Sequence, residues 1–123
     1  KQRIVLIACV KEKKSERCMA KDMYVSSAFQ SWMNYAESWG ANQIYILSGK
    51  HGLLALNEFI DPYDFNLNTA KPEERKKWAK QVISKLSDKT ELKEDTFLVL
   101  ANSIYAEYLT PHLSHYAMPL KID

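Results

Sequence analysis

The sequence Q-I-Y-I-L-S-G-K-H-G-L-L-A-L-N-E-F-I-D-P-Y-D spans residues 43–64. It contains the clearest change in the chain from an apolar run to polar residues that could carry chemistry. Its apolar run at residues 44–47 is too short for a helix and predicts a buried strand. The run stops at S-G-K-H-G, residues 48–52, where a hydroxyl, a cation and an imidazole lie among glycines. Glycine lets a ligand approach the backbone closely, and open α/β sheets place their sites at the carboxyl ends of strands. The alternative is a tight turn with incidental polar residues.

Other apolar runs predict further strands on either side of this stretch. Residues 3–9, R-I-V-L-I-A-C, form a continuous run rich in β-branched side chains. Such a run is typical of a strand that is covered on both faces in a parallel sheet. Residues 96–101, T-F-L-V-L-A, predict a third strand, and residues 116–120 begin a fourth.

A helix is predicted between the first two strands, over residues 25–39, because apolar side chains recur there at helical spacing. Ser26 or Ser27 can cap its start, and Gly40 suits the position just after its end. The Trp and Met side chains on its apolar stripe are more typical of a core than of a cofactor site.

Helices and strands therefore alternate along the chain. A second helix is expected from Pro72 and a third over residues 104–109, while residues 10–24 and 52–71 predict a polar loop and a long excursion. Alternation implies parallel strands with right-handed crossovers. We expect one α/β domain over residues 1–123: a three-layer Rossmann-like sandwich with a mainly parallel sheet of about four strands, in the order 2-1-3-4, and helices on both faces.

Composition fits a globular domain, with 46% hydrophobic and 26% charged residues, and the net charge of +2 is too small to indicate nucleic acid or a membrane. No apolar run approaches the roughly 18 residues of a membrane span, and no leader is recognisable. Cys9 and Cys18 do not form a C-x-x-C pair, so we expect reduced thiols in the cytoplasm. We also expect a tail beyond residue 123, because the last strand has only begun there.

Polar residues from separate segments would meet at the carboxyl edge of a parallel sheet. Cys9 follows the first strand, Ser48 to His51 follow the second, and Asn102 follows the third. Cys9 is either an inert buried thiol or a nucleophile, and lysines such as Lys11 favour the reactive thiolate. His51 would then act as its acid–base partner.

The remaining candidates are binding residues. Lys50 would hold a phosphate together with backbone N–H groups, and Asp64 would orient His51 or grip the edge of a base. Tyr24 and Tyr63 would stack on a ring, with ordinary packing as the alternative for each. The sequence contains no P-loop, dinucleotide fingerprint, nucleophile elbow or zinc spacing, so we expect neither a metal nor a cofactor.

Several of these residues also form a recognisable set of motifs. The strings are Cys9-x-Lys11, Tyr24-x-Ser26, Ser48-x-Lys50-His51-Gly52-Leu53-Leu54 and Pro62-Tyr63-Asp64. Together they resemble an uncharacterised bacterial and phage domain family of unknown function over nearly the whole chain. The chain is also similar, more distantly, to the α/β domain of archaeosine synthases, which modify a deazaguanine base in transfer RNA. Their Lys-Pro-Tyr motif is broken up here, so their nitrile–amine chemistry is not carried over.

Three hypotheses follow. The first is a small cytoplasmic enzyme that acts on a nucleobase, nucleotide or nucleic-acid substrate by transfer or glycosidic-bond chemistry, with Cys9, His51 and Asp64 as catalytic residues. Its substrate-binding residues would be Lys11, Tyr24, Ser26, Ser48, Lys50, Tyr63 and Asn102. The second is a non-catalytic module that binds a nucleotide or a nucleic-acid end. The third is a partner-binding domain with an exposed apolar interface at residues 52–71. The oligomeric state is left open.

Overall fold

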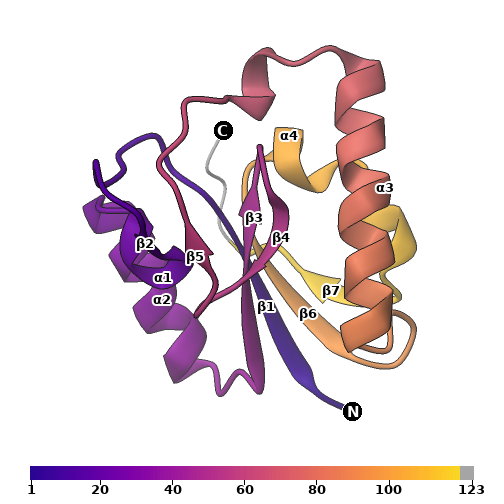
Figure 1. The fold of residues 1–123 in the computed structure, drawn as a ribbon. Coiled ribbons are helices and arrows are strands. Elements are labelled where there is room, and N and C mark those ends of the chain that lie inside the picture. The colour runs from indigo at the N-terminus through magenta and orange to yellow at the C-terminus, as the bar shows by residue number, and fades with distance from the viewer. Residues whose placement is uncertain (120–123) are drawn as a thin grey trace.

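The structure, a computed structural model, describes residues 1–119 and is built around a mostly parallel five-stranded sheet (Figure 1). The strands stand in the order β4-β3-β1-β6-β7. Their bounds are β1 Arg3–Ala8, β3 Gln43–Ser48, β4 Gly52–Ala55, β6 Thr96–Leu100 and β7 His115–Ala117. β1 is parallel to both β3 and β6, β7 is parallel to β6, and β4 is antiparallel to β3. The predicted order of the four parallel strands is confirmed, and β4 is an addition at one edge.

The central position of β1 explains its continuous apolar sequence. Alternate residues of a strand point to opposite faces. Ile4 and Leu6 belong to one buried core, and Val5 and Ile7 belong to a second core. Because β1 has a core on each face, neither face is in contact with water, and both sets of alternate side chains are apolar. This confirms the prediction that the strand is covered on both faces.

The two cores are covered by different helices, which Figure 1 shows on either side of the sheet. Trp78, Val82 and Leu86 of α3 (Pro72–Lys89) complete the core that contains Ile4. Phe29 and Ala36 of α2 (Ser27–Ser38) complete the other core. Helices therefore pack on both faces. Within residues 1–119, no helix is both long and apolar enough to cross a membrane.

The predicted helix ends are largely confirmed. The Ser26 side chain accepts a hydrogen bond from the Phe29 N–H at 3.1 Å, and Gly40 follows α2 with a positive φ of 82°. Pro72 opens α3. The third helix is shorter than predicted: α4 spans Ser103–Ala106, and the backbone then tightens into 3₁₀ turns that include η2 (Thr110–His112).

The prediction of an irregular loop at residues 10–24 and a long excursion at 52–71 was wrong, because both segments contain regular structure. They hold β2 (Cys18–Met19), α1 (Ala20–Met23), β5 (Phe59–Ile60) and η1 (Leu67–Thr69). β2 pairs with β5 in an antiparallel ladder, and the Ala20 N–H donates to the Glu58 carbonyl at 2.7 Å. Backbone pairing thus joins the two connections into one unit. We call this unit the cap, and it consists of residues 17–24 and residues 56–63. Strands of two residues carry no periodicity in sequence.

The turn after β3 forms a hairpin rather than an open loop. Ser48 pairs with Gly52, whose φ of 74° strongly favours glycine. Leu53 and Leu54 of β4 are buried on opposite faces of the sheet. Phe59, at 58%, and Phe65, at 40%, are the exposed large apolar residues of the stretch, and they are not neighbours in sequence. This packing counts against the hypothesis of an exposed apolar interface at residues 52–71.

The fourth predicted strand appears as β7, which begins one residue earlier than predicted, and Leu120 lies outside the described residues.

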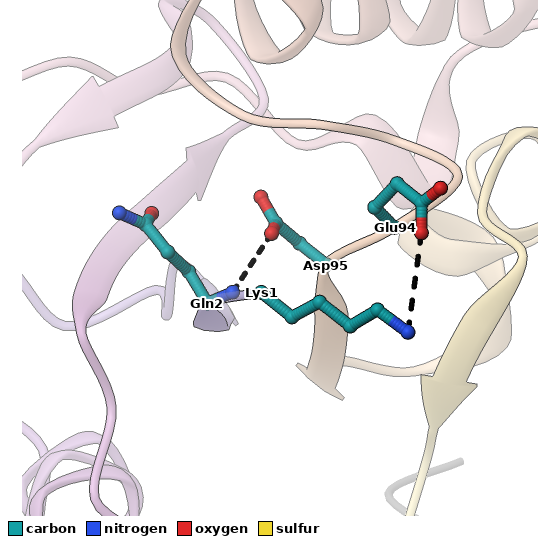
Figure 2. A network of polar contacts seen from close by, with 4 residues as sticks. All are labelled: Lys1, Gln2, Glu94 and Asp95. Carbon is teal, nitrogen blue, oxygen red and sulfur yellow. Dashed lines mark hydrogen bonds and ion pairs between the residues drawn. The ribbon is translucent and has the colours of Figure 1, made fainter.

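At the amino end of the parallel strands, Asp95 is 3% exposed, and its carboxylate links the start of β6 to the start of β1 (Figure 2). It accepts hydrogen bonds from the backbone N–H groups of Gln2, at 2.8 Å, and Glu91, at 2.9 Å. Burial by itself raises the pKa of Asp95, but these donors outweigh it, and the pKa lies below its usual value.

Candidate functional site

A cleft of about 590 Å³ opens at the carboxyl edge of the parallel strands. Its lining residues come from the ends of β1 and β6, the start of α2 and the segment that leads into η1. They are Ala8, Cys9, Val10, Lys11, Glu12, Lys13, Ser26, Ser27, Ala28, Trp32, Asp64, Phe65, Asn66, Asn68, Asn102 and Tyr105. A volume of this size is typical of a site for a small molecule.

The topology explains why a cleft forms at this place. The chain leaves β1 toward α2 on one face of the sheet and leaves β6 toward α4 on the other face. Connections that diverge from neighbouring parallel strands leave a crevice between them, and open α/β sheets bind ligands in that crevice. Cys9 and Asn102 lie at its two sides.

The start of α2 forms one wall. Ser26, Ser27 and Ala28 line the cleft there, and the Ser26 side chain is already used as the helix cap. The first turn of a helix carries partial positive charge. Lys11 and Lys13 line the same cleft, so this wall is electropositive, although Glu12 lies between them.

Cys9 forms a defined contact with Tyr105. Its sulfur lies 3.4 Å from the Tyr105 hydroxyl, which also accepts a hydrogen bond from the backbone of Leu67. Because that hydroxyl oxygen receives the Leu67 N–H, its own proton is available for the sulfur. Burial, and then the neighbouring Cys9, raise the pKa of Tyr105, so its proton is retained at neutral pH. The Tyr105 ring packs edge-on against Trp78 at 5.5 Å, which fixes its position.

Residues 64–68, which lead into η1 and include its first two residues, form the outer wall, and contacts on two sides hold them in place. Arg75 of α3 donates to the backbone carbonyls of Leu67, at 3.2 Å, and Asn68, at 2.7 Å. Gly49 lets the segment lie close to the turn, since a Cβ there would be 3.2 Å from the Phe65 ring and 3.3 Å from the Tyr105 hydroxyl. The wall is therefore anchored from both sides.

A buried chain of hydroxyl groups joins the end of β3 to the cap. Ser48 donates to the Tyr63 hydroxyl at 2.8 Å, and the Tyr63 and Tyr24 hydroxyls lie 2.6 Å apart. Burial raises the pKa of Tyr24 to about 12 and raises that of Tyr63 as well. Lys13 lies over both rings, with its Nζ 4.6 Å from the centre of Tyr63 and 5.8 Å from that of Tyr24. Both tyrosines are thus neutral structural partners of a lysine that faces the cleft.

His51 belongs to this buried chain and does not line the cleft. Its backbone N–H donates to the Ser48 hydroxyl at 3.0 Å, and its ring meets the Tyr63 ring edge-on at 5.1 Å. Burial, and then the charge of Lys50, lower the pKa of His51. Its Nε2 is buried and has no hydrogen-bond partner within residues 1–119. The structure places no contact between His51 and either Cys9 or Asp64 in this part of the chain.

The predicted site residues thus fall into three groups. Those that line the cleft are Cys9, Lys11, Ser26, Asp64 and Asn102. Those in the buried chain behind it are Tyr24, Ser48, His51 and Tyr63. Lys50 is exposed on the hairpin turn and lies outside the cleft.

Sequence reasoning missed several residues of the cleft. Tyr105 carries a usable signal, because it stands three residues after Asn102 and so shares its face of a helix. Trp32 was assigned to the core, and it packs against the core and also lines the cleft. Phe65, Asn66 and Asn68 lie in a segment without periodicity, and no sequence signal points to them.

Among residues 1–119, no group of three or more His, Cys, Asp and Glu side chains is arranged to hold a metal ion. Together these features describe a mixed α/β protein with a cleft of small-molecule size at the carboxyl edge of its parallel strands. The chain belongs to a family of unknown function, DUF6884, which it matches over residues 4–122. Comparisons with curated proteins and with solved structures gave no match.

Proposed function

We propose that the protein is a small enzyme that binds a nucleobase or nucleotide in the cleft and acts on it by transfer or glycosidic-bond chemistry. The observation that supports this best is the position of the cleft, between the diverging ends of β1 and β6, with Cys9 facing it. The proposal includes a Rossmann-like, three-layer fold, for which crevices of this kind are the usual ligand site.

The lining residues suit the two parts of a nucleotide. Lys11 is exposed on the cleft wall beside the first turn of α2, and both favour an anionic group. Trp32 and Phe65 supply aromatic surface on which a base can stack. Asn102 and Asp64 offer polar atoms that can fix the orientation of a ring.

Cys9 is the nucleophile in this proposal. The thiolate, after the thiol has lost its proton to solvent, attacks the sugar carbon of the glycosidic bond, so a C–S bond forms as the bond to the base breaks, and the base leaves with a proton from solvent. Water or another acceptor then attacks the same carbon, the C–S bond breaks, and the thiolate is released. The Tyr105 hydroxyl lies 3.4 Å from the sulfur and can donate its proton to a thiolate, and a hydrogen bond to an anion is stronger than one to a neutral group. The proposal gives His51 a supporting position behind Tyr63 and no chemical step, because it does not reach the cleft.

Thermal shifts with a panel of nucleotides and bases test binding, and chromatography of the incubated mixtures tests turnover. We expect stabilisation by at least one nucleotide, a loss of that stabilisation in Lys11→Ala, and little change in Lys50→Ala, whose side chain lies outside the cleft. Cys9→Ser should retain binding and lose turnover, whereas Cys18→Ser in the cap should retain both. Equal turnover by wild type and Cys9→Ser would remove the thiol from the mechanism.

A non-catalytic nucleotide-binding module is the second candidate. It is favoured by one observation: within residues 1–119, the partner of Cys9 is a tyrosine hydroxyl and not a base such as His51. The module keeps Lys11 and the aromatic walls but needs no reactive thiol. A Cys9 that stays inert toward iodoacetamide across neutral pH, in a protein that binds nucleotides without converting them, would favour the module.

A further inference from the structure

We propose that Asp64 recognises the ring of the ligand, and that this ring carries an exocyclic amino group. The inference rests on the proposed function, since it names the class of nucleobase that the cleft selects. The inference is drawn from the hydrogen-bond donors and acceptors on the outer wall of the cleft that have no partner among the described residues. This wall carries Asp64, Asn66 and Asn68 at alternate positions of the sequence.

The carbonyl oxygens of the asparagine side chains are already used inside the protein. The Asn66 Oδ1 accepts from the Asn68 backbone N–H at 2.9 Å. The Asn68 Oδ1 accepts from the Asn102 side-chain amide at 3.4 Å, and the Asn102 Oδ1 accepts from the Tyr105 N–H at 3.2 Å. The NH₂ groups of Asn66 and Asn68 make no hydrogen bond to the residues that the structure describes, so these two lining side chains can offer donors to a ligand.

Asp64 is the exception on this wall. An ionised carboxylate only accepts hydrogen bonds. Asp64 is exposed, lines the cleft, and makes no hydrogen bond or ion pair within the part of the chain that the structure describes. Asp61, three residues earlier, is instead paired with Arg17 at 3.2 Å. The wall thus presents one unpaired acceptor next to two donors.

A ring that matches this wall offers an N–H donor group to Asp64 and an acceptor atom to an asparagine. Cytosine, adenine and guanine do so, because each has an exocyclic amine beside a ring nitrogen or a carbonyl oxygen. In uracil the N–H on the pairing edge is flanked by two carbonyl oxygens, which repel a carboxylate. Phe65 follows Asp64 directly and is 40% exposed, so a ring held by Asp64 has an aromatic surface to lie against.

Two ligand pairs test the amine. GMP and IMP differ by the amine alone, whereas CMP and UMP differ in the amine and in the adjacent ring nitrogen, which is an acceptor in CMP and carries a proton in UMP. We expect wild type to bind the amino member of each pair about tenfold or more tightly in titration calorimetry, as one base contact discriminates elsewhere. Asp64→Asn replaces one acceptor oxygen with a donor NH₂, so the preference should fall to near unity or reverse. Asp61→Asn is the control, because it removes a nearby exposed carboxylate that lies outside the cleft, and it should keep the preference. Circular dichroism checks that both variants are folded.

The outcomes separate this inference from the function on which it rests. Binding of all four nucleotides with equal affinity, lost in Lys11→Ala, would overturn the role of Asp64 and leave the nucleotide site standing. An amine preference that survives in Asp64→Asn would overturn it as well. If none of the four nucleotides binds, the proposed function falls, and the inference falls with it.

Discussion

The hydroxyl of Tyr105 lies 3.4 Å from the sulfur of Cys9 and joins the start of α4 to the end of β1 across the cleft. We expect Tyr105→Phe to slow the alkylation of Cys9 by iodoacetamide about tenfold at neutral pH, because a hydrogen bond to a charged group contributes roughly 1.5–3 kcal/mol. Tyr108→Phe is the control, since Tyr108 contacts Lys76 and does not line the cleft. Equal rates in both variants would show that the Tyr105 hydroxyl does not act on the thiol.

The paired hydroxyls of Tyr24 and Tyr63 should stabilise the fold as a unit. Tyr63→Phe removes the acceptor of Ser48 and the partner of Tyr24, and an unsatisfied buried polar group costs about 1–3 kcal/mol. The double variant Tyr24→Phe/Tyr63→Phe should lose less free energy of unfolding than the sum of the single variants, because one replacement already breaks the shared bond. Urea unfolding measures all three. Strict additivity would mean that the two hydroxyls are not coupled.

Alkaline pH should weaken the fold through the same pair. Burial raises the pKa of Tyr24 from 10.0 to about 12, so the folded state keeps a proton that the unfolded chain releases first. This stabilisation is complete below about pH 10 and is lost as the pH rises toward 12. The free energy of unfolding should therefore fall over that range in wild type and fall less in Tyr24→Phe. The exposed Tyr116 offers a control replacement by Phe that should leave the pH dependence unchanged.

Acidic pH should lower the free energy of unfolding through Asp95, which lies at the other end of the sheet. The pKa of Asp95 is lowered in the folded state, so its stabilisation is present above the unfolded value, about 3.9, and is lost as the pH falls through the folded value. Asp95→Asn can accept only one of the two backbone N–H bonds, and we expect a loss of about 1–3 kcal/mol at pH 7. Unfolding midpoints at pH 7 and pH 3 should differ less in this variant than in wild type. Asp88→Asn, on the exposed face of α3, is the comparison.

Gly49 should control the shape of the cleft by its lack of a side chain. In Gly49→Ala the new methyl group would stand 3.2 Å from Phe65 and 3.4 Å from the Leu67 backbone nitrogen, so the outer wall must shift. Overpacking of this kind costs about 1–3 kcal/mol, and we expect weaker nucleotide binding as well. Lys50→Ala, at the next position in the same turn, should change neither. Unaltered binding and stability in Gly49→Ala would show that the wall adapts freely.

The sequence predicted the parallel part of the sheet well because burial on both faces leaves a plain signal. Residues 3–9 and 96–101 are almost wholly apolar, and each could only be a strand in the middle of an α/β sheet. Ser26 and Pro72 marked helix starts through local hydrogen bonding and fixed φ, which depend on few neighbours. The cap was missed for the opposite reason, since β2 and β5 are stabilised by each other rather than by their own sequence.

The sequence predicted that polar candidate residues would gather at the carboxyl edge of the sheet, and about half of those candidates line the cleft there. Cys9 and Asn102 follow directly from the ends of neighbouring parallel strands. His51 was placed in the same group because it also follows a strand, but the antiparallel return of β4 turns it toward Tyr63. Phe65 and the asparagines near it line the cleft because Arg75 of α3 holds this segment by hydrogen bonds to its backbone. A contact between distant parts of the chain leaves no pattern in the local sequence.

The cap has a consequence for how this chain acquires its structure. Its two halves leave the sheet at different strands. Residues 18–21 of the first half take backbone partners from residues 56–60 of the second half, whereas Met23 and Tyr24 pair with Lys14 and Lys13 close by in the sequence. Residues 18–21 therefore lack these partners until the segment after the hairpin has been synthesised. One wall of the cleft, through Lys13 and its tyrosine neighbours, is thus assembled late. The same wall should be the first to exchange its amide hydrogens when the native protein opens.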